Sequence, residues 1–367
     1  MRFLIVIPTY NRPDLLLEAV DSLLGQDYQD WRLIVSDNVS DVPAVEALGS
    51  RLDDPRIRVI RQAEHVHGTE HGNRIWRTTL DEDFDYVAFL ADDDYLVPGA
   101  LSHISLLQGL DLLVAGNIGY FYQKTGEVIA TGLQFSNEVE HIETMGSVLG
   151  NAEQAGIVVH GMHALPQVAI PETHVSFFFL HRQLVEKIQG RFGGLLVEPF
   201  GDIGLGRAAA FTTNSSYVTR PIGVVRFFDN YGQVKDRHRL AAHHNISFLH
   251  SPLKHVSFVN CAAESYLALL SSLGLEGKPS PRLFLRHLKE ISNDKRKTLD
   301  TAAAFLQGVK AIFAQHQFGG LMRFLLSRAR GTSKRASSTP IAKRCPDIAC
   351  AAQALIAYDK KRREISV

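Results

Sequence analysis

The feature that most constrains the fold is an alternation of short apolar runs and helical repeats over residues 1–115. Apolar residues at helical spacing predict helices at 13–24, 42–52 and 68–80. Mostly apolar runs beside them predict buried strands, namely Phe3–Ile7, Trp31–Val35, Ile57–Ile60 and Tyr86–Leu90. Strands and helices in this order form right-handed crossovers and a mostly parallel sheet. We therefore expect an α/β fold.

Polar side chains stand directly after three of the predicted strands. The first strand is followed by Thr9–Arg12, the second by Ser36–Asn38 and the fourth by Asp92–Asp94. In open α/β sheets, ligands bind outside the carboxyl ends of the strands, so a ligand site is expected here. The first turn has neither a GxGxxG pattern nor a GxxxxGK[ST] loop, which argues against dinucleotide-binding and P-loop proteins.

The three consecutive aspartates Asp92–Asp94 require a compensating charge. Two unit charges about 4 Å apart repel by roughly 4 kcal/mol at an effective dielectric constant near 20. A divalent cation is the simplest counter-charge, and ligation by oxygen alone suits Mg²⁺ or Mn²⁺. The alternative is a solvated acidic turn without a ligand.

Four blocks carry a resemblance to a known family. In chain order they are Ile5–Arg12, Leu23–Gln26, Leu33–Asn38 and Phe89–Asp94. Together they resemble family 2 glycosyltransferases of the bacterial surface-glycan type, strongly over residues 1–115 and weakly to about 230. The resemblance implies a GT-A (nucleotide-diphospho-sugar transferase) fold, with a Rossmann-like mostly parallel sheet and inversion of the anomeric centre.

The resemblance also assigns donor-binding roles. Pro8 and Tyr10 would line the nucleobase pocket, and Asp37 would accept a hydrogen bond from the ring N–H of the base. Asn73 stands where the family has a donor-pocket asparagine. Two structural alternatives stay open: Asp37 caps a turn, and Asn73 is a helix surface residue.

The aspartate cluster would hold the rest of the donor. By the same resemblance Asp92 binds the ribose, and Asp93 binds the metal that bridges the diphosphate, with Asp94 as a further metal ligand. Many relatives have an aspartate at the position of Ala91 and a basic residue at that of Gly72, so the ligand assignment is less defined here. The family's late metal-binding histidine is also missing, and Phe228 or a neighbour takes its place.

An inverting transfer needs a base near the acceptor hydroxyl. The segment Gly190–Arg207 resembles the acceptor side of the family, and it assigns Asp202 as the general base, with Glu198 as the alternative. The structural interpretation is that Asp202 caps a helix at 203–210.

Length and composition favour two regions and exclude several protein classes. We expect a GT-A domain at 1–235, with a donor-binding half at 1–115 and an acceptor half at 116–235, followed by a helical region at 236–367. The 367 residues include three cysteines, all after residue 260, which excludes a disulfide framework. No apolar run approaches the roughly 20 residues of a membrane span, so we expect a cytoplasmic protein.

Charge is divided unevenly along the chain. Residues 1–135 contain 10 Lys and Arg against 21 Asp and Glu, while the whole chain is balanced at 39 of each. Basic residues flank apolar ones in 318–344, which predicts peripheral contact with the inner membrane face and a lipid-linked acceptor. An ordinary packed helix with a solvated tail is the favoured alternative. Aromatic residues do not interleave with the basic ones, so nucleic acid is not expected.

These observations predict an inverting, metal-dependent transferase. It would move a sugar from a nucleoside-diphosphate donor, a UDP-sugar, to a hydroxyl of a glycan or lipid-linked acceptor. The alternative is a non-catalytic nucleotide-sugar-binding or scaffolding subunit, which the departure at Ala91 and the missing histidine motivate.

Overall fold

The computed structural model describes residues 1–130, 137–154, 156–159, 175–199, 201, 205–228, 248–253, 258–280, 283, 286–287, 310, 339–342 and 344–365. Their strands are β1 (Phe3–Thr9), β2 (Trp31–Asp37), β3 (Ile57–Arg61), β4 (Tyr86–Phe89), β5 (Tyr95–Leu96), β6 (Leu113–Tyr122), β7 (Glu127–Ala130), β8 (Val139–Glu143), β9 (Ile157–Val159), β10 (Phe178–His181), β11 (Asn214–Phe227), β12 (Gly277–Pro279) and β13 (Thr339–Ala342).

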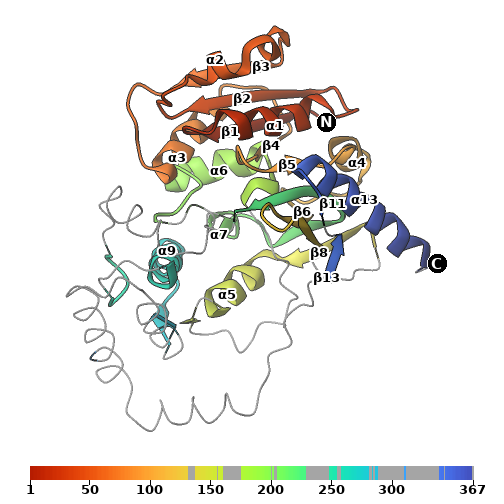
Figure 1. Cartoon of the computed structure of the whole chain (residues 1–367). Coiled ribbons are helices and arrows are strands. Elements are labelled where there is room, and N and C mark those ends of the chain that lie inside the picture. Colours follow the sequence, from red (N-terminus) through yellow and green to blue (C-terminus); the bar gives the residue numbers. More distant parts are fainter. Residues whose placement is uncertain are drawn as a thin grey trace.

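The helices of the same residues alternate with these strands in the first third of the chain (Figure 1). They are α1 (Pro13–Leu24), α2 (Ala44–Leu48), α3 (Gly68–Thr79), α4 (Ala100–Leu106), α5 (Thr144–Gln154), α6 (Arg182–Phe192), α7 (Leu205–Ala208), α9 (Phe258–Ser272) and α13 (Ile348–Ile365), with 3₁₀ turns at Gly49–Asp53 and Val175–Phe177. The α/β class is confirmed.

One large mixed sheet organises the described residues. Its order is β13-β7-β6-β10-β4-β1-β2-β3, and β11 pairs with β5, β6 and β8 beside this path. The four strands predicted from residues 1–115 pair in parallel, as expected. Strand β10 continues the sheet in the antiparallel sense between β4 and β6.

Strand β1 shows why its sequence is apolar without interruption. Phe3, Ile5 and Ile7 pack into a core on one face of the sheet, with residues of α1, α4 and α13. Leu4 and Val6 point to the other face and pack with residues of α3 and α6. Because side chains of a strand alternate between faces, a strand covered by helices on both sides must be apolar at every position.

The C-terminal residues return to this sheet. Strand β13 pairs with β7, and α13 packs on the same core as α1 (Figure 1). Residues 339–342 of the predicted membrane-contact segment 318–344 are thus built into the sheet, while 318–338 lie outside the described residues. The predicted boundary at 235/236 also lies outside them and stays a prediction.

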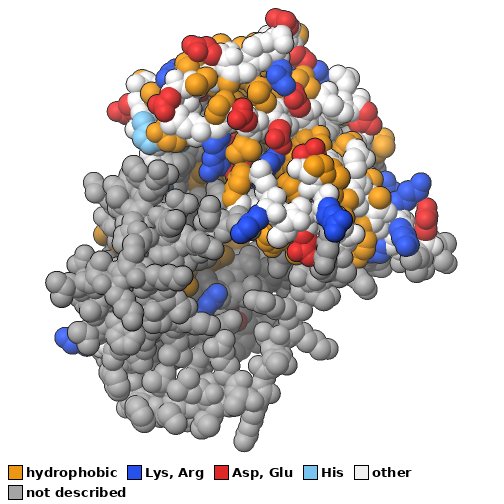
Figure 2. Space-filling view, viewed as in Figure 1, with side chains coloured by type: hydrophobic (Ala, Val, Ile, Leu, Met, Phe, Trp, Pro, Cys, Tyr) orange, Lys and Arg blue, Asp and Glu red, His pale blue; other side chains and the backbone are white. Residues whose placement is uncertain are grey.

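Figure 2 shows acidic and basic side chains interspersed over the part of the molecule formed by the first helices and strands, and several Lys and Arg side chains near α13. None of the described helices has both the length and the apolar composition required to cross a membrane.

Candidate active site at the carboxyl edge of the sheet

The parallel register brings three predicted strand ends to one level. Thr9 at the end of β1 is the register partner of Asp37 at the end of β2. The pairing of β1 with β4 runs to Val6 and Phe89, and its continuation by three residues places Thr9 beside Asp92. The Thr9 hydroxyl donates a hydrogen bond to Asp92 Oδ2 at 2.8 Å. The sheet therefore brings Asp37 and the aspartate cluster to one edge, as predicted.

Asp92 is a buried carboxylate held on both oxygens. Its Oδ2 accepts from Thr9, and its Oδ1 accepts from Arg12 Nη1 at 3.2 Å. Burial raises the pKa of Asp92 to about 6, and the Asp93 carboxylate adds to this rise, while the Arg12 guanidinium and the Thr9 hydroxyl oppose it. Asp92 is therefore mostly ionised at neutral pH, at an electrostatic cost that its partners reduce.

Arg12 joins the first two aspartates of the cluster. Its Nη1 lies 3.2 Å from Asp92 Oδ1 and 2.9 Å from Asp93 Oδ2. The compensating charge that the sequence demanded is therefore present inside the chain, as a guanidinium from the turn after β1. This residue was quoted in the first sequence block but was given no role there.

Asp94 turns away from this pair, toward strand β11. Its Oδ1 accepts the backbone N–H of Arg226 at 3.1 Å, and its side chain is buried. The guanidinium of Arg226 donates to the Asp93 carbonyl at 3.1 Å and forms an ion pair with Glu18. Arg226, which the sequence did not single out, thus holds the backbone of the cluster from strand β11.

The residues fit a divalent cation at Asp92 and Asp93. Two carboxylate oxygens, one from each residue, already converge on a single cationic nitrogen of Arg12. Mg²⁺ and Mn²⁺ are bound through one or two carboxylates together with phosphate and water oxygens, and this donor set supplies the protein's share. Among the described residues, no group of three or more His, Cys, Asp and Glu side chains is arranged as a metal site. Asp94 stays a predicted ligand.

Asp37 is fully buried and heavily bonded at the end of β2. Its Oδ1 accepts the N–H of Ser40 at 2.7 Å, and its Oδ2 accepts the N–H of Ala44 at 3.1 Å and the Arg61 guanidinium. Burial raises the pKa of Asp37, but the bonds from Ser40, Ala44 and Arg61 outweigh it and lower the pKa below its usual range. The side chain therefore caps the turn after β2, and base recognition remains its predicted second role.

Tyr10 follows the end of β1 and is exposed to solvent. The residue is 44% exposed, and the centroid of its ring lies 4.3 Å from that of the His65 ring, at an interplanar angle of 35°. His65 Nδ1 in turn lies 3.1 Å from the Asn38 carbonyl. The tyrosine is thus placed as an open stacking platform near the predicted base pocket. His65 was missed in the sequence because it lies in an irregular segment without a motif.

Asn73 connects α3 to the segment after α6. Its Nδ2 donates to the Leu196 carbonyl at 3.2 Å, and its Oδ1 accepts the Leu196 N–H at 2.8 Å. The departure at Gly72 has a steric reason here, because a Cβ on Gly72 would lie 2.3 Å from Leu196 Cδ1. Any side chain at this position would need the tip of the Leu196 side chain to shift. The donor-pocket role of Asn73 stays a prediction.

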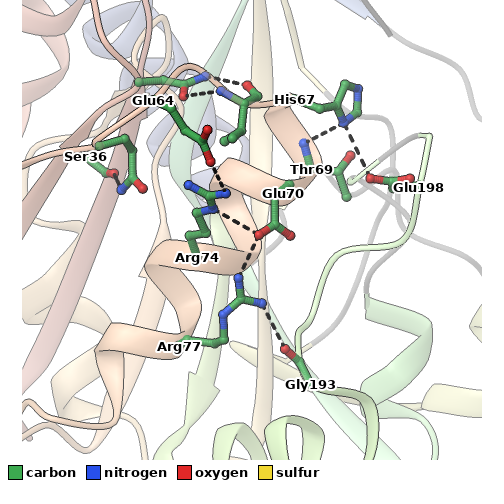
Figure 3. A network of polar contacts seen from close by, with 12 residues as sticks. Ser36, Glu64, His67, Thr69, Glu70, Arg74, Arg77, Gly193 and Glu198 are labelled. Carbon is green, nitrogen blue, oxygen red and sulfur yellow. Dashed lines mark hydrogen bonds and ion pairs between the residues drawn. The ribbon is translucent and has the colours of Figure 1, made fainter. Parts of the chain in front are cut away.

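Helix α3 approaches the predicted acceptor side through its polar face (Figure 3). Glu70 bridges Arg74 and Arg77, and Arg77 donates to the Gly193 carbonyl at 3.4 Å. At the N-terminus of α3, His67 Nδ1 lies 3.9 Å from Glu198 Oε1. Burial lowers the pKa of His67. Glu198, the alternative base, is largely exposed, whereas Asp202 lies outside the described residues.

A family model matches the part of the chain that forms this edge. Residues 4–148 match the model described as glycosyl transferase family 2. The family predicted from the four sequence blocks is therefore confirmed for this segment.

Two curated bacterial proteins align with this chain over segments of 100 residues. The chain is 38% identical over 100 residues to the GalNAc(5)-diNAcBac-PP-undecaprenol beta-1,3-glucosyltransferase of Campylobacter jejuni, over 27% of this chain and 31% of that protein. It is 35% identical over 100 residues to the succinoglycan biosynthesis protein ExoW of Rhizobium meliloti, over 26% of this chain and 31% of that protein. In both cases the match spans less than a third of the relative.

Solved structures resemble the chain at low identity. The structure of S. aureus TarS 1–349 in complex with UDP has a TM-score of 0.48 and 12% sequence identity, over 98% of this chain and 92% of that one.

Proposed function

We propose that this chain, whose residues 4–148 match glycosyl transferase family 2, is an inverting, metal-dependent glycosyltransferase of surface-glycan biosynthesis. It transfers a sugar from a nucleoside-diphosphate donor, a UDP-sugar, to an acceptor hydroxyl. The observation that carries the proposal is the meeting of Thr9, Arg12, Asp92 and Asp93 at the carboxyl edge beside Asp37. This is the position in an α/β sheet where ligands bind.

Each residue has a task in the proposed reaction. Tyr10 stacks on the nucleobase, Asp37 accepts from its ring N–H, and Asp92 binds the ribose. Asp93, with Asp92 or Asp94, holds Mg²⁺ or Mn²⁺, which neutralises the charge of the leaving diphosphate when bound.

The proposed transfer is a direct displacement. The acceptor oxygen attacks the anomeric carbon, the bond from that carbon to the diphosphate oxygen breaks, and the hydroxyl proton goes to Asp202. The products are the inverted glycoside and the free nucleoside diphosphate. Glu198 is the alternative base, since it lies on the same segment near the N-terminus of α3.

The acceptor is proposed to be a glycan or lipid-linked saccharide. The name of one relative contains a PP-undecaprenol-linked saccharide and that of another contains succinoglycan biosynthesis, which supports this class of acceptor. A cytoplasmic enzyme would meet a lipid-linked acceptor through the predicted membrane-contact segment 318–344. Flotation of the protein with vesicles rich in anionic lipid, compared with neutral vesicles, tests that contact.

The donor site is tested by thermal stabilisation with UDP and Mn²⁺. A ligand at about 100 times its Kd stabilises the folded protein by about 2.7 kcal/mol. Asp93→Asn should lose the metal-dependent part of this shift, while Asp53→Asn, at an exposed position, should keep it. An unchanged shift in Asp93→Asn would contradict the assigned role.

The catalytic assignment is tested by turnover. Asp202→Asn should keep donor binding and lower the rate by about 10²- to 10⁴-fold, the usual contribution of a general base. Glu198→Gln is the matched comparison, and a larger loss in that variant would move the base to Glu198. A protein that binds UDP with Mn²⁺ but never releases UDP from a UDP-sugar would instead be a binding or scaffolding subunit.

A further inference from the structure

The carboxylates of Asp92 and Asp93 are buried, whereas the Arg12 side chain that pairs with them is partly exposed to solvent. The Arg12 side chain is 37% exposed, whereas those of Asp92 and Asp93 are 8% and 10% exposed. Arg12 therefore reaches in from the outer side and covers two carboxylates that the sheet edge holds in place.

The backbone beneath Arg12 is held in a fixed turn. Asn11 has a positive φ of 53°, which is uncommon for a residue other than glycine. Its N–H donates to the Ser40 hydroxyl at 3.0 Å, and its Oδ1 accepts the N–H of Asp41 at 2.7 Å. Pro13 follows directly and begins α1. The turn thus fixes the starting point of the arginine, so that only its long side chain can move.

The other arginine of the cluster provides a useful contrast. The side chain of Arg226 is only 3% exposed, and it is held by the Asp93 carbonyl, by Gln123 and by Glu18. In the part of the chain that the structure describes, the guanidinium of Arg226 bonds to the Asp93 carbonyl and to two side chains outside the cluster, and to neither of the carboxylates of Asp92 and Asp93. Arg12 bonds to the two carboxylates themselves, where a metal would bind.

We propose that Arg12 is an exchangeable internal counter-ion that makes metal binding depend on the donor. Without a donor, the guanidinium occupies the position between Asp92 and Asp93, and a metal ion alone must displace it into water. A diphosphate provides Arg12 with a new anionic partner, and the carboxylates become available to the metal. Metal and nucleotide then bind cooperatively. This inference rests on the proposed function.

This cooperativity can be measured as the ratio of the Mn²⁺ affinities with and without nucleotide. If nucleotide raises the affinity for metal by some factor, metal must raise the affinity for nucleotide by the same factor. We expect wild-type protein to bind Mn²⁺ at least tenfold more tightly with saturating UDP than without it. In Arg12→Gln, Mn²⁺ alone should bind about tenfold more tightly than in wild type, and the effect of UDP should shrink by a similar factor.

The experiment measures Mn²⁺ binding by electron paramagnetic resonance, since the signal of free Mn²⁺ is lost when the ion is bound. Wild type, Arg12→Gln and Arg12→Lys are titrated with and without UDP, and Arg12→Lys should lie between the other two. Arg51→Gln is the matched control, because Arg51 also makes two bonds to an aspartate, Asp21, away from the site. The control should behave as wild type does.

The outcomes separate this inference from the proposed function. The counter-ion role is overturned if Arg12→Gln and Arg12→Lys bind Mn²⁺ alone no more tightly than wild type does. It is also overturned if no variant binds Mn²⁺ in the absence of UDP. Wild type that binds no UDP at any Mn²⁺ concentration overturns the proposed function instead. Wild type that binds both ligands without coupling leaves the function standing and rejects the exchange.

Discussion

The buried histidine beneath the end of β2 gives a quantitative test of the structure. His71 is 3% exposed, and its Nε2 lies 2.8 Å from the Ser36 hydroxyl, one residue before Asp37. Burial lowers the pKa of His71 to about 4; the Asp37 carboxylate opposes this shift, whereas His65 and Arg74 add to it. We predict that His71→Gln makes the protein less sensitive to mild acid, because glutamine can keep a hydrogen bond to Ser36 without titrating.

The magnitude follows from the two pKa values of His71. In the unfolded chain the imidazole titrates near about 6.5, so unfolded molecules take up a proton between pH 6.5 and 4 while native ones do not. The share of the free energy of unfolding that depends on neutral His71 is therefore fully present above about pH 6.5, and it is lost as the pH falls toward 4. The loss from pH 7 to pH 5 is about 2 kcal/mol, with a limit of about 3 kcal/mol at lower pH.

The assay is urea denaturation at pH 7, 6 and 5, followed by tryptophan fluorescence. The wild-type free energy of unfolding should fall by about 2 kcal/mol more than that of His71→Gln between pH 7 and 5. Ser36→Ala is the control, because it removes the hydrogen bond but keeps the histidine, and its pH dependence should equal that of wild type. Equal pH dependence in wild type and His71→Gln would refute the buried neutral imidazole.

Three further substitutions test the packing and hydrogen bonds around the site, each by urea denaturation at pH 7. Gly223→Ala should cost about 1–3 kcal/mol, because its Cβ would lie 1.9 Å from a ring carbon of the buried Phe177; an unchanged midpoint would contradict that close approach. Thr9→Val should cost about 1.5–3 kcal/mol, since it removes a hydrogen bond to the charged Asp92, and a neutral effect would show that the bond is absent. Asn73→Ala should cost about 1–3 kcal/mol through the lost bonds to Leu196, whereas stability equal to wild type would count against that link.

The first third of the fold was predictable because its signals are local. Apolar runs and helical spacing located β1 to β4, α1 and α3 within about two residues of their observed bounds, whereas the helix predicted at 42–52 is divided into α2 (Ala44–Leu48) and a 3₁₀ turn at Gly49–Asp53. Buried parallel strands and their crossover helices are each encoded in fewer than fifteen consecutive residues.

The second half of the sheet could not be placed in the same way. Strand β10 lies between β4 and β6, although about 60 residues separate it from β6 along the chain. Strand β13 reaches β7 over an even longer separation. Such neighbours are selected by packing against the finished sheet, and four or five apolar residues do not specify which edge they join.

The acidic residues of the candidate site could be predicted from the sequence, whereas the arginines that pair with them could not. A run of aspartates after a strand is visible in any sequence, and the electrostatic argument correctly required a counter-charge. The partner is Arg12, about 80 residues earlier, because the parallel register sets the two strand ends side by side. Arg226 lies more than 130 residues later, on a strand whose position the sequence did not reveal.

The charges at this edge favour a donor that arrives together with a metal. Among the described residues, six charged side chains meet around the cluster: the anions Asp92, Asp93, Asp94 and Glu18 and the cations Arg12 and Arg226. When all six are ionised, they carry two negative charges in sum, the charge that one divalent cation neutralises. A diphosphate alone would add negative charge beside this surplus, and a metal alone would compete with Arg12. In the proposed reaction the pair of ligands would avoid both costs, because the metal would balance the carboxylates while the guanidinium would balance the phosphates.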